Sequence, residues 1–159
     1  AIEAGNVELV AVHTPGHAPD HLCFWHGDSR TVFCGDLAVS GTTVVIPASA
    51  GGDLGAYLSS LERVIALQPS RLLPAHGPVI EDPIHILRRY LAHRREREDQ
   101  VLAALAAGDS TTEAIVSRIY AGLDPALVTM ARESVTAHLL KLQREGRVTN
   151  TGETWTLAP

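Results

Sequence analysis

Apolar and polar residues alternate along three short segments near the start of the chain, and this period of two predicts β-strands. The alternating segments span residues 7–12, 22–25 and 31–34, and a shorter apolar segment spans 71–73. After Asp53, apolar residues recur every three or four positions, which predicts an amphipathic helix that ends before Pro69. A further short strand is expected at 44–46. The first part of the chain therefore predicts strands, a helix and another strand.

A long helix is expected from Asp82-Pro83 to about residue 107, because Asp caps helices and Pro is favoured in their first turn. The middle of this helix, 94–100, is almost entirely charged. Arg94 with Glu98, and Arg95 with Asp99, are spaced to form ion pairs along a solvated helix. This pattern predicts a connector between two hydrophobic cores.

Beyond Gly108 the pattern changes to two shorter amphipathic segments followed by an alternating one. A capping box at 110–113 opens the first helix, and Asp124-Pro125 opens the second. Residues 147–157 then alternate around a turn, which predicts a β-hairpin. Helix, helix and two-stranded wing is the order of a winged helix-turn-helix. We therefore divide the chain into residues 1–81, a connecting helix at 82–107, and a winged-helix domain at 108–159.

Composition excludes some classes of protein. The net charge of −5 argues against a protein that mainly coats nucleic acid. The two cysteines lie within predicted strands, and the sequence shows neither an apolar run of membrane-spanning length nor a signal peptide, so a cytoplasmic protein with no membrane partner is expected. The chain begins at Ala1 without Met and reaches a strand almost at once, which indicates a processed product or a fragment.

Candidate chemistry follows three of the predicted strands. The loop 13–21 holds three histidines and an aspartate, Asp36 follows the strand 31–34, and His76 follows the strand 71–73. Imidazole and carboxylate groups are the usual ligands of catalytic zinc. Each signal is modest alone, but the three together and in this order predict a metal site built at strand ends.

These stretches carry a family resemblance: HTPGHAPDH at 13–21, FCGD at 33–36, LLPAHGPVI at 72–80 and AHRREREDQVL at 92–102. The set resembles the C-terminal half of a hydrolase with the metallo-β-lactamase fold, and most closely the lactamase-beta-like endoribonuclease branch, which carries a winged-helix module after its hydrolase domain. The implied fold class is α/β (α+β): half of an αββα sandwich followed by a winged helix.

The resemblance also implies a role for individual residues. His17 and His76 resemble metal-ligating histidines, and Asp36 resembles the catalytic carboxylate shared by two zinc ions. His21 is expected to orient these ligands from behind, and His13 is expected to support the loop.

One family motif, His-x-His-x-Asp-His, is absent from the chain. The 159-residue chain alone is therefore expected to bind zinc weakly and to be inactive. It would also leave one face of its sheet bare. The expected partner is a missing N-terminal half of the hydrolase domain, or a second copy of the chain in a homo-oligomer.

For the complete protein, the resemblance implies metal-assisted hydrolysis. The winged helix favours RNA phosphodiesters as substrates, with weak nucleic-acid contacts expected from Arg132, Lys141, Arg144 and Arg147. One alternative is a thioesterase or lactonase similar to hydroxyacylglutathione hydrolase. Another is a non-catalytic winged-helix protein that binds nucleic acid. The retained set of ligand-type residues at strand ends argues against the non-catalytic alternative.

Overall fold

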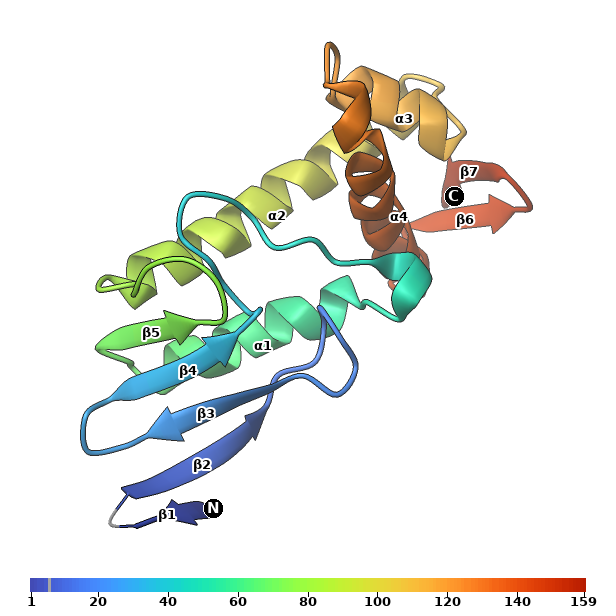
Figure 1. Cartoon of the computed structure of the whole chain (residues 1–159). Coiled ribbons are helices and arrows are strands. Elements are labelled where there is room, and N and C mark those ends of the chain that lie inside the picture. Colours follow the sequence, from blue (N-terminus) through green and yellow to red (C-terminus); the bar gives the residue numbers. More distant parts are fainter. Residues whose placement is uncertain (6) are drawn as a thin grey trace.

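The computed structural model describes residues 1–5 and 7–159 (Figure 1). The strands are β1 (Ile2–Ala4), β2 (Val7–His13), β3 (Leu22–His26), β4 (Thr31–Gly35), β5 (Arg71–Pro74), β6 (Val148–Thr151) and β7 (Thr154–Leu157). The α-helices are α1 (Leu54–Ala66), α2 (Pro83–Ala106), α3 (Thr112–Ile119) and α4 (Val128–Arg144). Short 3-10 turns lie at Ala48–Ala50 and Pro125–Leu127.

The first five strands form one sheet in the order β1-β2-β3-β4-β5. Neighbours from β1 to β4 are antiparallel, whereas β4 and β5 are parallel and are joined through α1. The last two strands form a separate antiparallel hairpin. Figure 1 shows α1 and α2 lying along the same side of the sheet, while α3, α4 and the hairpin gather at the far end of α2.

One face of the sheet packs against α1 and α2. Its side chains include Cys23, Val32 and Leu72, which are fully buried and belong to the same hydrophobic cluster as Tyr57 of α1 and Leu87 of α2. Alternation along the strands explains this arrangement, because every second residue of a strand points to the same face. The apolar positions of α1 predicted from the sequence are the ones that complete this core.

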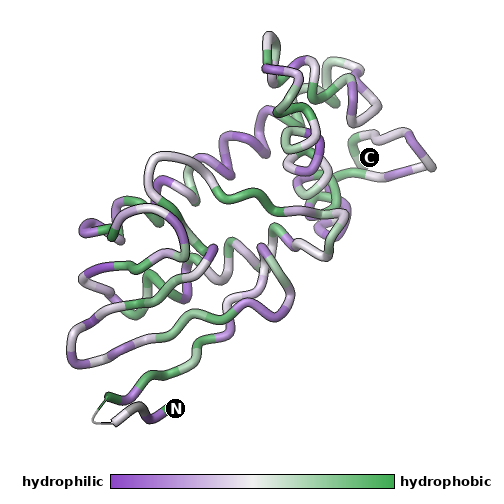
Figure 2. Tube along the Cα trace, in the orientation of Figure 1, coloured by the Kyte–Doolittle hydropathy of each residue, from purple (hydrophilic) through white to green (hydrophobic). Residues whose placement is uncertain are grey.

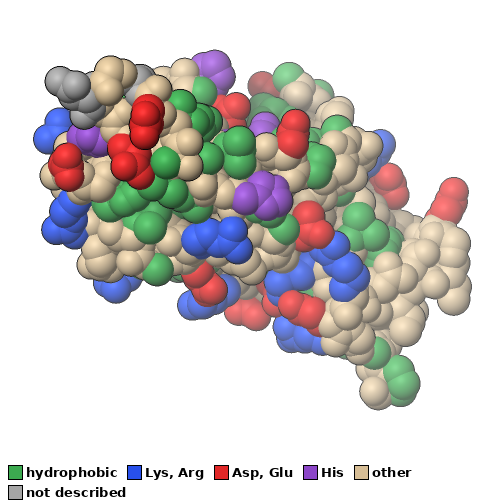
Figure 3. Space-filling view, turned by 90° about the horizontal axis from the view of Figure 1, so that it is seen from below, with side chains coloured by type: hydrophobic (Ala, Val, Ile, Leu, Met, Phe, Trp, Pro, Cys, Tyr) green, Lys and Arg blue, Asp and Glu red, His purple; other side chains and the backbone are tan. Residues whose placement is uncertain are grey.

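The opposite face of the sheet is apolar and open. The strand register places Ile2 beside Leu9 and Phe33 beside Phe24, on the face that α1 and α2 do not cover. Ile2, Val7, Leu22 and Phe33 each expose more than 40% of their surface. Figure 3 shows hydrophobic side chains gathered on the side of the molecule that carries the sheet. This surface, named the open sheet face below, matches the bare face expected from the sequence.

Helix α2 contributes residues to two hydrophobic cores. Its N-terminal half contributes Leu87 and Leu91 to the first core, and its C-terminal half contributes Val101 and Leu105 to a second core with α3, α4 and the hairpin. Figure 2 shows a hydrophilic stretch of α2 between these regions. In the described part of the chain, no helix combines the length and apolarity needed to cross a bilayer.

Three expectations differ from the structure. Residues 44–46 form no strand; Val44 and Ile46 instead pack into the core from a loop. Arg94 does not pair with Glu98; it is only 4% exposed and donates to the carbonyl oxygen of Val44. The strand β1 has no counterpart among the expected elements; it pairs locally with β2. For residues 44–46 and Arg94, a tertiary contact replaces the local pattern.

His138 of α4 makes stability depend on pH. Its side chain is 1% exposed, and neither ring nitrogen has a hydrogen-bond partner among the residues that the structure describes. Burial, followed by the nearby charges of Arg94 and Lys141, lowers the pKa of His138 from 6.5 to about 3. Between these values the unfolded chain binds a proton that the folded chain does not, so stability falls as the pH decreases.

We expect the His138→Leu variant to lose part of this pH dependence. The histidine alone contributes a loss of about 2 kcal/mol in the free energy of unfolding between about pH 7 and pH 5, and leucine removes that contribution. Urea unfolding at both pH values measures the difference. The matched control is His85→Gln, at an exposed position of α2. Its free energy of unfolding should change with pH as that of the wild type does. An unchanged slope in His138→Leu would show that another group is responsible.

Candidate metal centre

The loop 14–21 between β2 and β3 is fastened to α1. The carbonyl oxygen of Gly16 accepts from the backbone N–H of Asp53 at 2.8 Å, and that of Pro15 accepts from the Ser60 hydroxyl at 2.7 Å. His13 closes the loop on itself, with its Nε2 atom 3.0 Å from the carbonyl oxygen of Pro19. This contact fits the supporting role expected for His13. The loop is thus held by a rigid helix, which suits a site that needs fixed ligand positions.

Gly16 is required by this close packing. A Cβ atom at position 16 would lie 2.4 Å from the Cα atom of Tyr57, which is backbone of α1 and cannot move aside. The φ angle of Gly16 is +143°, a conformation that side chains with a Cβ rarely adopt. The glycine therefore lets the loop lie directly on the helix and places the next residue, His17, at its edge.

His17 presents one ring nitrogen for a ligand. Its Nδ1 atom lies 2.8 Å from the carbonyl oxygen of Val45, an acceptor, so Nδ1 carries the proton. The lone pair of the neutral ring then belongs to Nε2. A backbone carbonyl on the second nitrogen is the usual arrangement for a metal-ligating histidine. The local geometry of His17 therefore fits the ligand role expected from the sequence.

His21 holds the backbone beside Asp36. Its Nε2 atom accepts from the N–H of Asp36 at 3.2 Å, and its Nδ1 atom lies 3.1 Å from the carbonyl oxygen of Thr14 and 2.9 Å from the Thr14 hydroxyl. Burial is the main influence on the pKa of His21 and lowers it, which favours the neutral ring that these contacts need. Because both nitrogens are occupied within the chain, His21 fits an orienting role rather than a ligand role.

Asp36 and His76 meet at the ends of β4 and β5. The Ala75 N–H donates to the carbonyl oxygen of Gly35 at 3.0 Å, which ties the two strand ends together. The His76 Nε2 atom lies 3.8 Å from Asp36 Oδ1, and the two side chains expose 80% and 38% of their surface. The backbone N–H of Asp36 also donates to Nε2 of His21. The structure therefore brings Asp36, His76 and His21 together at this end of the sheet.

These residues do not form a complete metal site by themselves. Within residues 1–5 and 7–159, no group of three or more His, Cys, Asp or Glu side chains is arranged to hold a metal ion. The fixed tautomer of His17 and the open carboxylate of Asp36 fit a metal, since imidazole and carboxylate are its usual ligands. A full shell of three or four protein ligands would need further groups.

The four basic residues expected to touch nucleic acid are paired with acids in the chain. Arg132 pairs with Glu113 at 3.3 Å, and Arg147 pairs with Glu98 at 3.0 Å. Lys141 pairs with both Glu98 and Glu145, at 2.6 and 2.9 Å, and Arg144 pairs with Asp53, at 3.0 Å. Partial burial opposes protonation of Lys141, but hydrogen bonds to both glutamates raise its pKa. A nucleic-acid phosphate would have to compete with a carboxylate at each position.

The Arg144–Asp53 contact joins the winged module to the loop 14–21. Asp53 caps α1 by accepting from the Ala56 N–H at 2.9 Å, and its own N–H donates to the carbonyl oxygen of Gly16. Burial acts to raise the pKa of Asp53, but the hydrogen bonds from Arg144 and Ala56 lower it overall. Arg144 of α4 therefore braces the residue that anchors the loop of His17.

Sequence reasoning missed a second group of polar residues, on α2. Arg94 was expected to pair along the helix. With His93 and Arg97 it instead lines a cavity next to the loop 42–45. Four basic residues among positions 93–97 were the available signal, but nothing local indicated that a loop would cover them.

Comparison with known proteins agrees with this architecture. Residues 1–76 match the model of the metallo-beta-lactamase superfamily, and residues 111–155 match that of the beta-lactamase associated winged helix domain. The chain belongs to the metallo-beta-lactamase superfamily. The two matches agree in order with the hydrolase-like half and the winged module described above.

Several curated relatives are similar to this chain in sequence. A Drosophila melanogaster protein named beta-lactamase-like protein 2 homolog is 35% identical over 92% of this chain and 48% of its own length. A Caenorhabditis elegans protein with the same name is 31% identical over 94% of this chain and 49% of its own length. An atrochrysone carboxyl ACP thioesterase of Claviceps purpurea is 33% identical over 82% of this chain and 43% of its own. The chain spans about half the length of these relatives.

Solved structures show the same fold. A metallo-beta-lactamase family protein from Thermus thermophilus superposes with a TM-score of 0.84 at 23% identity, over 98% of this chain and 51% of that one. A beta-lactamase domain protein from Burkholderia ambifaria gives the same TM-score and identity, over 99% of this chain and 49% of that one. The arrangement of half-domain, α2 and winged module is therefore shared with both proteins.

Proposed function

We propose that the complete protein is a metal-dependent hydrolase, with zinc as the metal, and that this chain contributes His17, Asp36 and His76 as ligands. Two hydrogen bonds around the site support this proposal. The carbonyl oxygen of Val45 fixes the tautomer of His17, and the ring of His21 fixes the backbone at Asp36. When bound, zinc supplies Lewis acidity and activates water at neutral pH. The chain's own residues hold the ligand atoms in position and prevent their rotation.

A thioester is the substrate class that we favour. The four basic residues of the winged module are already bound to carboxylates, so they offer little free positive charge to a polyanion. Two relatives, from Claviceps purpurea and Passalora fulva, are named atrochrysone carboxyl ACP thioesterases. Hydrolysis of a thioester needs a polarised carbonyl and an activated water, which the proposed metal site provides.

RNA is the second candidate substrate. The winged helix is a common nucleic-acid-binding module, and its helix pair and hairpin are present here as α3, α4, β6 and β7. This observation favours nucleic-acid binding by module type alone. The proposed order of preference is therefore the reverse of the one that the sequence suggested, because the structure pairs the expected contact residues with acids.

The open sheet face supports a proposal about the rest of the protein. We propose that a further part of the same polypeptide, the other half of the hydrolase domain, covers this face and supplies the remaining metal ligands. A second copy of the chain is the alternative occupant. The apolar residues exposed on the face and the incomplete ligand set in the described part of the chain both support this arrangement.

The test compares two substrates with the full-length protein loaded with zinc. We expect metal-dependent hydrolysis of a glutathione thioester. Its kcat/KM should be at least about tenfold above the kcat/KM for cleavage of single-stranded RNA under the same conditions. Chelation with EDTA should abolish the activity, and added zinc should restore it. Metal-dependent RNA cleavage without thioester hydrolysis would overturn the substrate assignment. Equal activity with and without metal would overturn the proposed mechanism.

A further inference from the structure

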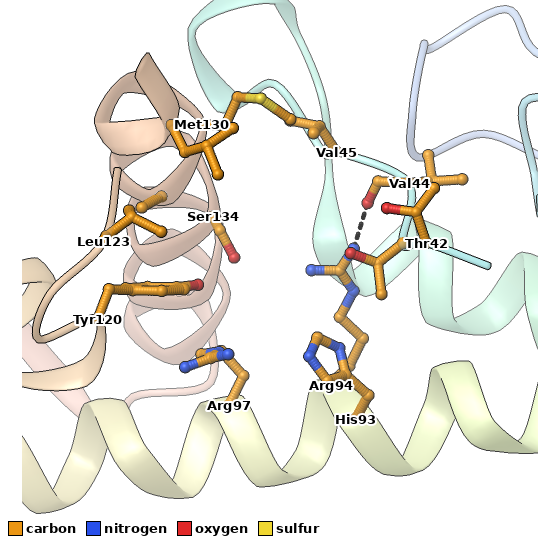
Figure 4. Close-up of a pocket in the computed structure, with 13 residues that line it drawn as sticks. Thr42, Val44, Val45, His93, Arg94, Arg97, Tyr120, Leu123, Met130 and Ser134 are labelled. Atoms are coloured by element: carbon orange, nitrogen blue, oxygen red, sulfur yellow. Dashed lines mark hydrogen bonds between the residues drawn. The ribbon is translucent and has the colours of Figure 1, made fainter. Parts of the chain in front are cut away.

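A cavity of about 220 Å³ lies between the loop 42–45, helix α2 and the winged module. Figure 4 shows His93 and Arg94 on one side of the cavity, Arg97 and Tyr120 on the other, and the hydroxyl of Ser134 turned toward the space between them. The upper wall is apolar and includes Met130. The cavity therefore combines basic groups from one helix with hydroxyl and apolar groups from its neighbours.

The basic groups of this cavity lack anionic partners. Arg94 is only 4% exposed; its guanidinium donates to the carbonyl oxygen of Val44 and lies 5.8 Å from the centre of the Tyr57 ring. Arg97 donates to Gln100 Oε1 at 2.6 Å and lies 4.3 Å from the centre of the Tyr120 ring. In the described part of the chain, no carboxylate lies within salt-bridge distance of either arginine, and no acidic residue lines the cavity.

Three buried donor or acceptor atoms remain without partners there. They are Nε of Arg94, Nε of Arg97 and Nδ1 of His93, counted over the residues that the structure describes. A purely structural role for Arg94, as a tie between α2 and the loop, accounts for its contacts with Val44 and Tyr57. It does not account for the unpaired atoms of Arg97 and His93. Arg94 is a buried charge with no anionic partner among the described residues, which is costly, so the pattern calls for an anion.

We propose that this cavity binds the phosphate group of a small organic phosphate. Guanidinium groups bind phosphate in a planar, forked geometry, and phosphate oxygens accept several hydrogen bonds at once. The hydroxyls of Thr42 and Ser134 line the same cavity and add donors. Its volume is several times the roughly 30 Å³ of a water molecule but below the range of about 300–1,000 Å³ for drug-sized ligands. It therefore holds a phosphate and a short apolar extension rather than a large ligand.

The cavity shares a wall with the candidate metal centre. Val45 lines the cavity, and its carbonyl oxygen holds Nδ1 of His17. A phosphate here has two possible sources, the remote end of the substrate or a free effector. Both use the same recognition chemistry. The binding inference itself does not depend on the proposed thioesterase activity.

The first experiment measures binding of inorganic phosphate to the full-length protein by isothermal titration calorimetry at constant ionic strength. We expect Arg97→Gln to weaken binding by about tenfold to a hundredfold, the range for losing a hydrogen bond to a charged group. The matched control is Arg95→Gln, the same charge change at an exposed position of α2, which should bind as wild type. Arg97→Lys keeps the positive charge but loses the forked geometry of the guanidinium. Its affinity for phosphate should lie between those of the wild type and Arg97→Gln.

Thermal unfolding of each variant separates a folding defect from a binding defect. If Arg97→Gln melts as wild type and binds phosphate with unchanged affinity, the inference is overturned, since phosphate would then be bound elsewhere, for example by the metal. Should Arg97→Gln unfold, Arg97→Lys decides: wild-type affinity in that variant would equally overturn the proposal. Undetectable binding of phosphate to the wild-type protein also overturns it.

The second experiment distinguishes the two sources of phosphate. S-acetyl-phosphopantetheine and S-acetyl-pantetheine are thioesters that differ only by a phosphate. If the site holds the substrate's own end, Arg97→Gln raises KM for the phosphorylated substrate alone. If the site holds an effector, added phosphate changes the rate with both substrates, and Arg97→Gln removes that response. Failure of all thioester hydrolysis would reject the proposed function but leave the calorimetric result standing.

Discussion

Replacement of Asp36 by asparagine in the full-length protein is expected to lower kcat/KM by about a thousandfold. Asparagine keeps the shape of the side chain but removes its charge, so the proposed anionic ligand would become a weaker, neutral one. Changing a partner that only orients a ligand costs about tenfold to a hundredfold in metal affinity or activity, and losing the ligand itself should cost more. Zinc content by elemental analysis and hydrolysis kinetics measure the two effects together.

The matched control for Asp36 is Asp28→Asn, at an exposed position in the turn between β3 and β4. It makes the same charge change on the same sheet and should leave both zinc content and kcat/KM within about twofold of wild type. If Asp36→Asn retained full zinc content and activity within about tenfold of wild type, Asp36 would not be a metal ligand, and the proposed site would be wrong.

The 159-residue chain expressed alone is expected to self-associate through the open sheet face. Complete burial of a large apolar side chain contributes about 1.5–3 kcal/mol. Ile2, Val7, Leu22 and Phe33 each still expose more than two-fifths of their surface, so covering the face gains about 1 kcal/mol for each of them. Sedimentation velocity over a concentration series should show dimers or larger species.

A double variant, Leu22→Thr with Phe33→Thr, removes apolar surface while keeping residues that favour strands, and it should shift the chain toward monomer. The control is Leu157→Thr, an equally exposed apolar position in the distant hairpin, at 42% exposure. It should associate as the unmodified chain does. A monodisperse, cooperatively unfolding monomer from the unmodified chain would contradict the expectation that this face needs a partner.

Most of the fold could be predicted because its signals are local. Asp53 and Asp82 cap the helices that the sequence assigned to them, through hydrogen bonds to Ala56 and His85. The strand β1 and the loop at 44–46 could not be predicted in the same way. Whether an apolar segment becomes a strand depends on the backbone that it meets in the folded protein, and Val44 and Ile46 pack into the core from a loop instead.

The candidate site was predicted in part, for a related reason. His17, Asp36 and His76 follow strands and lie in recognisable sequence motifs. The residues that hold them in place do not lie in such motifs, because they are distant in sequence. The hydrogen bond between His17 and Val45 spans 28 residues, and the one between Asp36 and His21 spans 15. The cavity beside α2 was missed because Arg94 has acids at the right spacing along its helix. Contact with the loop 42–45 outweighs that local pairing.

Helix α2 also fixes the orientation of the winged module relative to the sheet. Its 24 residues, about 36 Å long, carry core positions for both hydrophobic clusters on one continuous backbone. Each residue added within the helix would turn the winged module by about 100° relative to the sheet and move it by about 1.5 Å. The cavity, the Arg144–Asp53 contact and the second core all depend on that angle. The helix therefore tolerates substitution along its length far better than insertion or deletion.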